Sequence, residues 1–311
     1  MADIPLFLQA HFKEQVKDTF EAGIQQTVSK FAGAGIIDPE WTGEQVVYRT
    51  GSQVSFVETT GLRGGQTQQG EYTAGYRSGF KRDFEAAVQF DRNDARKLKS
   101  VALPESEVQT EMQNAWARKW DDVILDASRA VTLGGERPHI TPQALPADMT
   151  VPVTWDRVTD PGTVNTNLTY WKLAEALARM ELSDVDLDRE MVTLYISPRM
   201  KQAWMAYAQA AANEMFAKLI AAWLMKPSEG LLGCRVVVTN RLYTSAGNVQ
   251  AVVAAKRAFR LPPTKYEVKI DELSEKRHAI QIAVYAHTGA VRRYDELVKL
   301  IWCDPTKAIT P

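Results

Sequence analysis

Residues 59–80 read TTGLRGGQTQQGEYTAGYRSGF, a glycine-rich, polar stretch with almost no aliphatic side chains. A run of β-branched and aromatic residues, QVVYRTGSQVSFVET, precedes it, and FKRDFEAAVQF, in which apolar and polar residues alternate, follows it. The pattern predicts a β-hairpin with strands at roughly 46–58 and 80–91, which at about 3.3 Å per residue would project on the order of 40 Å. Because a two-stranded ribbon is only marginally stable alone, the hairpin is expected to contact something outside its own domain.

The same glycines could instead form a phosphate-binding loop or a mobile lid. The G-x-x-x-x-G-K-[ST] pattern is missing, and a strand-like run, not a helix, follows Gly64 and Gly65. The context therefore favours the tip of a hairpin.

No catalytic, cofactor-binding or metal-ligating residue is predicted. No serine stands in a G-x-S-x-G turn, and no H-E-x-x-H or paired C-x-x-C motif is present. The segment DVDLDREM at 184–191 resembles the start of a calcium loop, but Arg189 stands where such a loop needs glycine and Tyr195 where it needs an acid. This segment is interpreted as an acidic turn. The four histidines are scattered: His11, His139, His278 and His287.

The composition indicates a globular chain without a global electrostatic field. Of its 311 residues 45% are hydrophobic, and the net charge of -1 does not attract nucleic acid or an anionic membrane. The two cysteines, Cys234 and Cys303, lie beside apolar runs and are expected to be reduced core thiols, which suits a cytoplasmic protein. No targeting segment is predicted, and no apolar run reaches the roughly 18 residues of a membrane span.

The remaining periodicities predict two helices that flank the hairpin in the first half and a mixed α/β second half. The long helix over 104–131 carries Met112, Val123 and Ala127 on one face, with Trp116 and Trp120 beside it as packing anchors. The other expected elements are an amphipathic helix (11–31), an irregular proline-rich stretch (132–162), helices (165–184, 198–211 and 216–225), strands (191–197, 233–240, 249–255, 265–272 and 279–287) and a closing strand (within 290–304).

The order of these elements resembles the tailed-phage major capsid proteins of the Hong Kong 97 type. Residues 48–94 look like the family's extended loop, WDDVILDAS like the end of its spine helix, and LTYWKLAEALARMELSDVDLDREMVTLYISPRMKQAWM like the start of its axial domain. GAVRRYDELVKLIWCDPTKA resembles its final strand. The resemblance implies an α+β capsid fold, with these parts: N-terminal arm 1–43, extended loop 44–92, spine helix and peripheral domain 93–165, axial domain 166–285, and a return strand to the peripheral domain 286–311.

The resemblance further implies a structural protein that assembles into hexamers and pentamers of an icosahedral head around packaged double-stranded DNA. It implies many copies of the chain itself, a separate scaffolding protein, a portal and decoration proteins as partners, no sequence-specific DNA contacts, no membrane and no cofactor. The expected location is the virion, after assembly in the host cytoplasm. A basic cluster at the hairpin is expected to make charge pairs between subunits: Arg63, Arg77, Lys81, Arg82 and Asp83.

Two alternatives remain. An encapsulin-like cellular shell would share the fold, but encapsulins tend to have a shorter loop. A soluble enzyme with the hairpin as a lid would need converging polar groups, which the sequence does not offer. The other basic clusters, Arg96–Lys99 and Arg292 with Arg293, are expected to be solvated or to form salt bridges.

Overall fold

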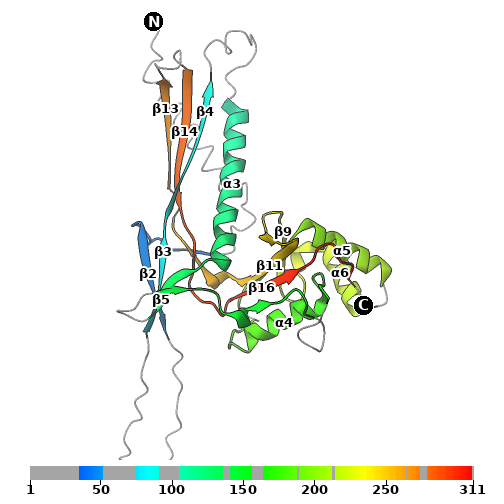
Figure 1. Cartoon of the computed structure of the whole chain (residues 1–311). Coiled ribbons are helices and arrows are strands. Elements are labelled where there is room, and N and C mark those ends of the chain that lie inside the picture. The colour runs from blue at the N-terminus through cyan, green and yellow to red at the C-terminus, as the bar shows by residue number, and fades with distance from the viewer. Residues whose placement is uncertain are drawn as a thin grey trace, which may run out of the picture.

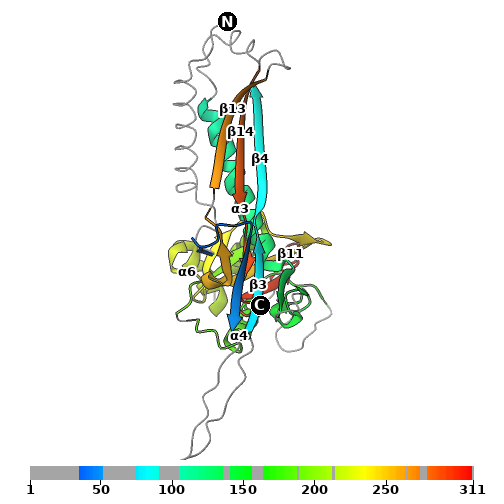
Figure 2. The same ribbon diagram turned by 90° about the vertical axis from the view of Figure 1, so that its left-hand side faces the viewer.

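The computed structural model describes residues 35–51, 74–90, 105–135, 141–155, 164–187, 189–211, 214–263, 265–273 and 279–309. Within these residues the molecule is elongated, with helix α3 (Glu105–Arg129) standing beside long strands, an α/β unit to one side and a hairpin at the opposite end (Figure 1). The view turned by 90° shows the long strands side by side in front of α3 (Figure 2). The predicted helix over 11–31 and the hairpin tip lie outside the described residues.

Six strands form the sheet of the α/β unit: β7 (Thr150–Val151), β8 (Val192–Ile196), β9 (Arg235–Val238), β10 (Thr244–Ser245), β11 (Asn248–Ala255) and β16 (Val298–Cys303). Their order is β7-β16-β11-β8-β9, with β10 paired to β11. The pairs β7–β16 and β8–β9 are parallel, and the other pairs are antiparallel. The three central strands, β8, β11 and β16, are mostly buried, as their apolar sequences require.

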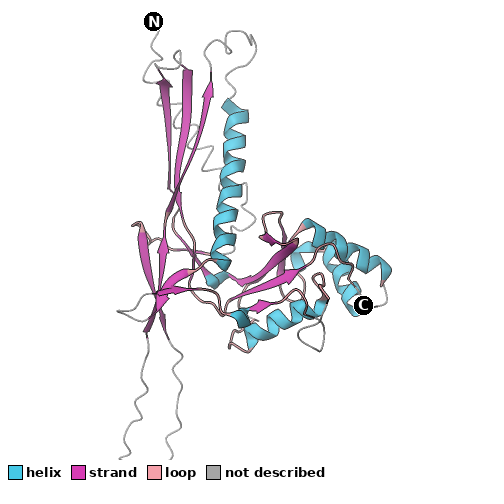
Figure 3. Cartoon of the chain, in the orientation of Figure 1, coloured by secondary structure: helices cyan, strands magenta, loops and turns pink. Residues whose placement is uncertain are grey.

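The two faces of this sheet lie in two different hydrophobic cores, because successive residues of a strand point to opposite faces. Ala251 and Val253 of β11 belong to the core formed with three helices (Figure 3): α4 (Tyr170–Glu181), α5 (Pro198–Ala210) and α6 (Met215–Met225). Val252 and Ala254 belong to the core that includes Trp120 and Ile124 of α3. The spine helix therefore closes one face of the sheet.

The helix starts follow the capping signals of the sequence. The side chain of Thr169, at the N-terminus of α4, accepts a hydrogen bond from the Lys172 backbone N–H at 3.3 Å. Ser197 does the same for Met200 at 3.2 Å, with Pro198 at the first position of α5. The described residues also contain three short 3-10 helices: η1 (Ala147–Met149), η2 (Pro227–Glu229) and η3 (Lys256–Ala258).

A second sheet packs against the first half of α3. Its three antiparallel strands, in this order, are β13 (Lys265–Leu273), β14 (Ala279–Thr288) and β4 (Arg82–Phe90). Ile282 and Val284 face Met112 and Trp116 of the helix, and the ring of Phe84 lies 6.1 Å from that of Trp116. The tryptophans of α3 are thus packing anchors, as predicted.

The prediction that residues 80–91 form the returning strand of the hairpin is wrong. The strand that pairs with β2 (Gln45–Gly51) is β3 (Ala74–Phe80), whereas β4 pairs with β14 over its whole length. The chain changes sheets at Lys81, whose backbone N–H donates to the Glu44 carbonyl at 2.8 Å. The alternating apolar residues of 84–90 need an apolar partner surface, and α3 supplies it where a two-stranded ribbon cannot.

The hairpin continues into a sheet of order β2-β3-β5-β6, because β5 (Thr132–Gly135) pairs with β3 and β6 (Thr141–Gln143) pairs with β5. The stretch 132–162 is therefore not entirely irregular. Pro142 is tolerated because β6 is the edge strand of this sheet. A small sheet beside the hairpin has the order β1-β12-β15, from β1 (Ile36–Ile37), β12 (Phe259–Leu261) and β15 (Val291–Arg292).

Two more placements differ from the sequence prediction. Residues 265–285 were expected in the unit 166–285, but β13 and β14 stand beside α3 with β4. The closing strand in 286–311 was expected to return to the peripheral sheet, but β16 lies between β7 and β11 in the sheet of the α/β unit. Its sequence VKLIWC is buried almost throughout, which fits a central strand and not an edge.

Candidate assembly surfaces

The described part of the chain holds no group of three or more His, Cys, Asp or Glu side chains that could bind a metal ion. Among the same residues, no helix is long and apolar enough to cross a membrane. Cys234 and Cys303 are free and buried, and burial raises the pKa of each thiol to about 12. Both cysteines are core residues, as expected from the sequence.

Of the residues predicted to pair between subunits, Arg77 is held inside its own subunit. Its guanidinium lies 2.5 Å from the carboxylate of Asp295 and donates to the Thr132 hydroxyl at 2.7 Å. The Arg77 residue is only 9% exposed. The ion pair fixes the base of the hairpin to the segment that leads into β16.

The other four residues lie in different settings. The Lys81 ammonium donates to the Thr42 carbonyl at 2.9 Å, and the Asp83 carboxylate lies 2.6 Å from Nδ1 of His287. Arg82 is exposed and makes no ion pair with the described residues. Arg63 lies outside the described residues.

Arg292 binds the same Asp295 carboxylate as Arg77 and also caps the C-terminus of α3. Its Nε donates to Asp295 at 2.6 Å, opposite the contact of Asp295 with Arg77. Burial lowers the pKa of the Arg292 guanidinium and the Asp295 carboxylate opposes this, so the group stays charged. Its Nη1 donates to three carbonyl oxygens at the end of α3: Ala127 (3.3 Å), Ser128 (2.9 Å) and Ala130 (3.0 Å). These carbonyls have no partner within the helix, and the positive charge also matches the helix dipole.

Close packing holds the base of the hairpin as well. Trp41 is fully buried beneath it, and a Cβ added at Gly79 would lie 2.8 Å from the Trp41 ring and 3.0 Å from Val291. Only glycine permits this approach. The hairpin therefore leaves the body of the subunit from a fixed base.

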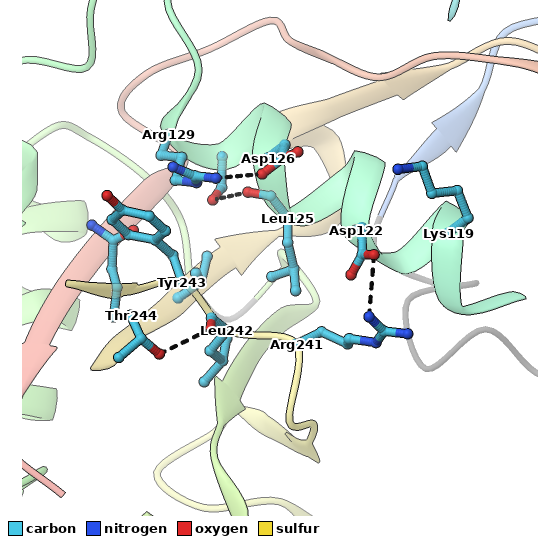
Figure 4. Close-up of a pocket in the computed structure, with 12 residues that line it drawn as sticks. Lys119, Asp122, Leu125, Asp126, Arg129, Arg241, Leu242, Tyr243 and Thr244 are labelled. Atoms are coloured by element: carbon cyan, nitrogen blue, oxygen red, sulfur yellow. Dashed lines mark hydrogen bonds and ion pairs between the residues drawn. The ribbon is translucent and has the colours of Figure 1, made fainter. Parts of the chain in front are cut away.

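A pocket of about 330 Å³ lies between the C-terminal part of α3 and residues 241–252 (Figure 4). Arg129 lies 2.6 Å from Asp126, and Arg241 lies 3.4 Å from Asp122, so the two arginines of the rim are each paired with an acid. The Arg129 guanidinium also stacks 3.9 Å from the centre of the Tyr243 ring. The accessible lining of the pocket is mostly polar, and five of its residues are buried: Leu125, Ser128, Leu242, Gln250 and Val252.

Large apolar side chains are exposed on the α/β unit. They belong to the three helices and the turn after α4: Trp171 (42%), Leu182 (84%), Met205 (43%), Met215 (75%) and Met225 (84%). Exposed apolar side chains mark a surface for association where they form a contiguous patch.

Sequence reasoning missed two of these features, although both left a signal. Asp295 follows Arg292 by three residues in VRRYDE, a spacing that permits an ion pair. Gln250 interrupts the apolar run of β11, and burying a polar side chain is unfavourable unless it forms a hydrogen bond.

The profile of the phage capsid protein family matches residues 8–212, which is more than half of the 311-residue chain. No curated protein matches the chain significantly. Solved structures are similar in fold at low identity. The capsid of Ralstonia phage GP4 is 11% identical, with a TM-score of 0.63 over 89% of this chain and 88% of that one. The capsid of a native GTA particle is 12% identical, with a TM-score of 0.59 over 88% and 90%.

The encapsulin SrpI of Synechococcus elongatus also has this fold. It is 11% identical, with a TM-score of 0.54 over 93% of this chain and 92% of that one. At such identities the structures establish the fold, and the profile match establishes the family. The chain therefore belongs to the phage capsid protein family, has the Hong Kong 97 type of capsid fold, and is a structural shell protein and not an enzyme.

Proposed function

We propose that copies of this chain form the hexamers and pentamers of an icosahedral head that encloses packaged double-stranded DNA. A separate scaffolding protein, a portal and decoration proteins complete the head, which is assembled in the host cytoplasm. DNA is held without sequence-specific contacts, in keeping with the net charge of -1. The proposal keeps the division into an N-terminal arm, an extended loop, a spine helix with the peripheral domain, and an axial domain. The sheet of β4, β13 and β14 is grouped with the spine helix, and β16 is grouped with the α/β unit.

The observation that carries the proposal is the hairpin. β2 and β3 pair from Gln45–Phe80 to Gly51–Ala74 and lead away from the body of the subunit (Figure 1). Arg77 and Trp41 fix the base of the hairpin, which is the part of it that the structure describes. In a shell it lies across the neighbouring subunit, which supplies the contacts that a free ribbon lacks. The exposed apolar side chains of α4–α6 are covered by other copies in the same assembly.

An encapsulin-like shell is the second candidate, because one of the similar structures is an encapsulin. The two functions differ in what the shell encloses. A phage head contains DNA, and an encapsulin-like shell contains a cargo protein, so the contents of purified particles distinguish them.

Electron microscopy of the full chain, expressed with its neighbouring genes, tests the proposal together with light scattering of the chain alone. We expect closed shells some hundreds of ångströms across, or rings of five and six subunits. A monomer or dimer that remains stable under both conditions would contradict assembly.

The residues predicted to pair between subunits include an exposed one, Arg82, and a buried one, Arg77, and substitutions at the two should have different effects. Arg82→Ala is expected to lower the salt concentration at which shells dissociate while leaving the melting temperature of the unassembled subunit unchanged, because this side chain is exposed. Arg77→Ala is expected to lower the melting temperature itself, because its partners are in the same subunit. Thermal denaturation and a salt titration followed by light scattering measure the two effects. Arg82→Ala shells with the salt resistance of wild type would exclude Arg82 as a contact between subunits.

A further inference from the structure

The carboxylate of Asp295 holds two arginines from different elements at once. Its Oδ2 lies 2.5 Å from Nη2 of Arg77, which belongs to the hairpin strand β3. Its Oδ1 accepts a hydrogen bond at 2.6 Å from Nε of Arg292, which belongs to β15. All three residues are buried, so two buried positive charges share one negative charge and repel each other. The pKa of Arg292 reflects this arrangement: burial lowers it most, Asp295 raises it, and the charge of Arg77 lowers it further.

This network leaves one donor of Arg292 unused. Its Nη2 is buried and has no hydrogen-bond partner among the described residues, whereas Nη1 donates to three carbonyls at the end of α3. Nε and Nη2 form one edge of the planar guanidinium, so the unused donor lies beside the Nε that already binds Asp295. Such an edge can bind both oxygens of a carboxylate, which is the bidentate geometry typical of arginine. Here the second oxygen is bound to Arg77 instead.

The same three side chains therefore have a second arrangement within reach. When Arg77 leaves Asp295, Oδ2 becomes available to Nη2 of Arg292, and a buried donor that lacked a partner gains one. The repulsion between the two arginines is relieved in the same step. The bonds from Nη1 of Arg292 to the end of α3 do not involve Asp295, so they are present in both arrangements. The two arrangements exchange one hydrogen bond for another and differ in whether the hairpin base is held.

We propose that Asp295 is a two-position latch for the hairpin. In one position it binds Arg77 and holds the hairpin base to the body of the subunit. In the other it binds Arg292 through both oxygens and lets the hairpin base shift, while the end of α3 stays capped and β3 stays paired with β5. The latch is a property of the single subunit and does not depend on the proposed function. In a shell it would allow copies in pentamers and hexamers to set their hairpins at different angles.

Hydrogen–deuterium exchange of the unassembled subunit tests the latch. Arg77→Met should speed the exchange of β3, because Asp295 no longer holds the hairpin base. The last turn of α3, residues 126–130, should keep its wild-type rate, because Arg292 still caps it. Arg292→Met should speed the exchange of both segments. Arg257→Met, which breaks an exposed ion pair with Glu190, is the matched control and should leave both rates unchanged.

The stability of these variants gives a second readout. Arg77→Met should raise the unfolding equilibrium constant by roughly tenfold or less, because Arg292 replaces the lost bond to Asp295. Without such a replacement, breaking a buried pair typically raises this constant by a factor of roughly a hundred or more. Arg292→Lys keeps the charge but cannot form the bidentate edge, so in that background Arg77→Met should have the larger effect. Chemical denaturation measures both factors.

Two results would overturn the latch. If the last turn of α3 exchanges as fast in Arg77→Met as in Arg292→Met, the three side chains act as one rigid unit. If β3 exchanges at the wild-type rate in Arg77→Met, Asp295 does not hold the hairpin. Should Arg292→Lys not fold, the exchange of Arg77→Met alone decides between the two arrangements. Failure of the chain to form shells would contradict only the proposed function, because the latch is tested in the unassembled subunit.

Discussion

Arg292→Met is expected to lower the free energy of unfolding of the subunit by about 3–5 kcal/mol, since removing one partner of a buried ion pair leaves the other uncompensated. The Arg292 side chain is fully buried, and it neutralises Asp295 together with Arg77. Its loss also leaves three carbonyl oxygens at the end of α3 without their donor. Because these contacts join the helix, the hairpin base and the segment before β16, we expect one cooperative loss of stability and not local fraying. Chemical denaturation of the unassembled subunit, followed by tryptophan fluorescence, measures it.

Arg257→Met is the matched control. Arg257 forms an ion pair with Glu190 at 2.6 Å, but its side chain is 60% exposed. An exposed pair contributes at most about 1 kcal/mol, so this variant should remain close to wild type. Equal effects of the two substitutions would show that the buried network is not a major source of stability.

Lys172→Met is expected to cost about 3 kcal/mol or more, because each buried carbonyl left without a donor costs roughly 1–3 kcal/mol. Lys172 is fully buried at the start of α4. Its ammonium donates three hydrogen bonds, to the carbonyls of Val153 (2.8 Å), Thr166 (2.9 Å) and Trp302 (2.8 Å). Methionine has a similar length but no donor, so α4, the loop before it and β16 lose the group that joins them.

Thiol labelling gives a local readout of this change. Cys303, next to Trp302 in β16, is fully buried, and burial raises the pKa of its thiol to about 12. The folded protein therefore holds this thiol protonated and inaccessible at pH 8, and it should react with Ellman's reagent only after opening. We expect faster labelling of Cys303 in Lys172→Met and the wild-type rate in Lys218→Met, a substitution on the exposed face of α6. A wild-type rate in Lys172→Met would show that the ammonium does not hold β16 in place.

The sequence allowed most elements to be predicted, because their signals are local. The caps at Thr169 and Ser197 and the apolar stripe of the spine helix lie within a few residues of what they specify. Val131 lies just beyond this stripe and is 59% exposed, because the helix ends at Arg129, where Arg292 donates hydrogen bonds to the last carbonyls. The end of α3 thus depends on a residue about 160 positions away, as the spacing of 165 residues in the Arg292–Ala127 contact illustrates.

Strand partners could not be predicted in the same way. The alternation around Phe84 indicates a strand, but it does not show whether the partner is β2 or β14. That choice depends on the apolar surface of Trp116, which becomes adjacent only in the folded chain. The same limit applies to the candidate contacts between subunits. The charge of Arg77 can be read from the sequence, whereas its burial against Asp295 is a property of the tertiary structure.

The position of β16 bears on the order of events during synthesis. Among the described strands it is the last in the chain, yet it lies between β7 and β11 and contributes Val298 and Leu300 to one core and Ile301 and Cys303 to the other. Neither core can close before residue 303 has left the ribosome, so the nascent chain keeps both faces of β11 open throughout elongation. A chain terminated early, before β16, would lack the completed α/β unit. Premature termination products would then be excluded from the growing head by their own failure to fold.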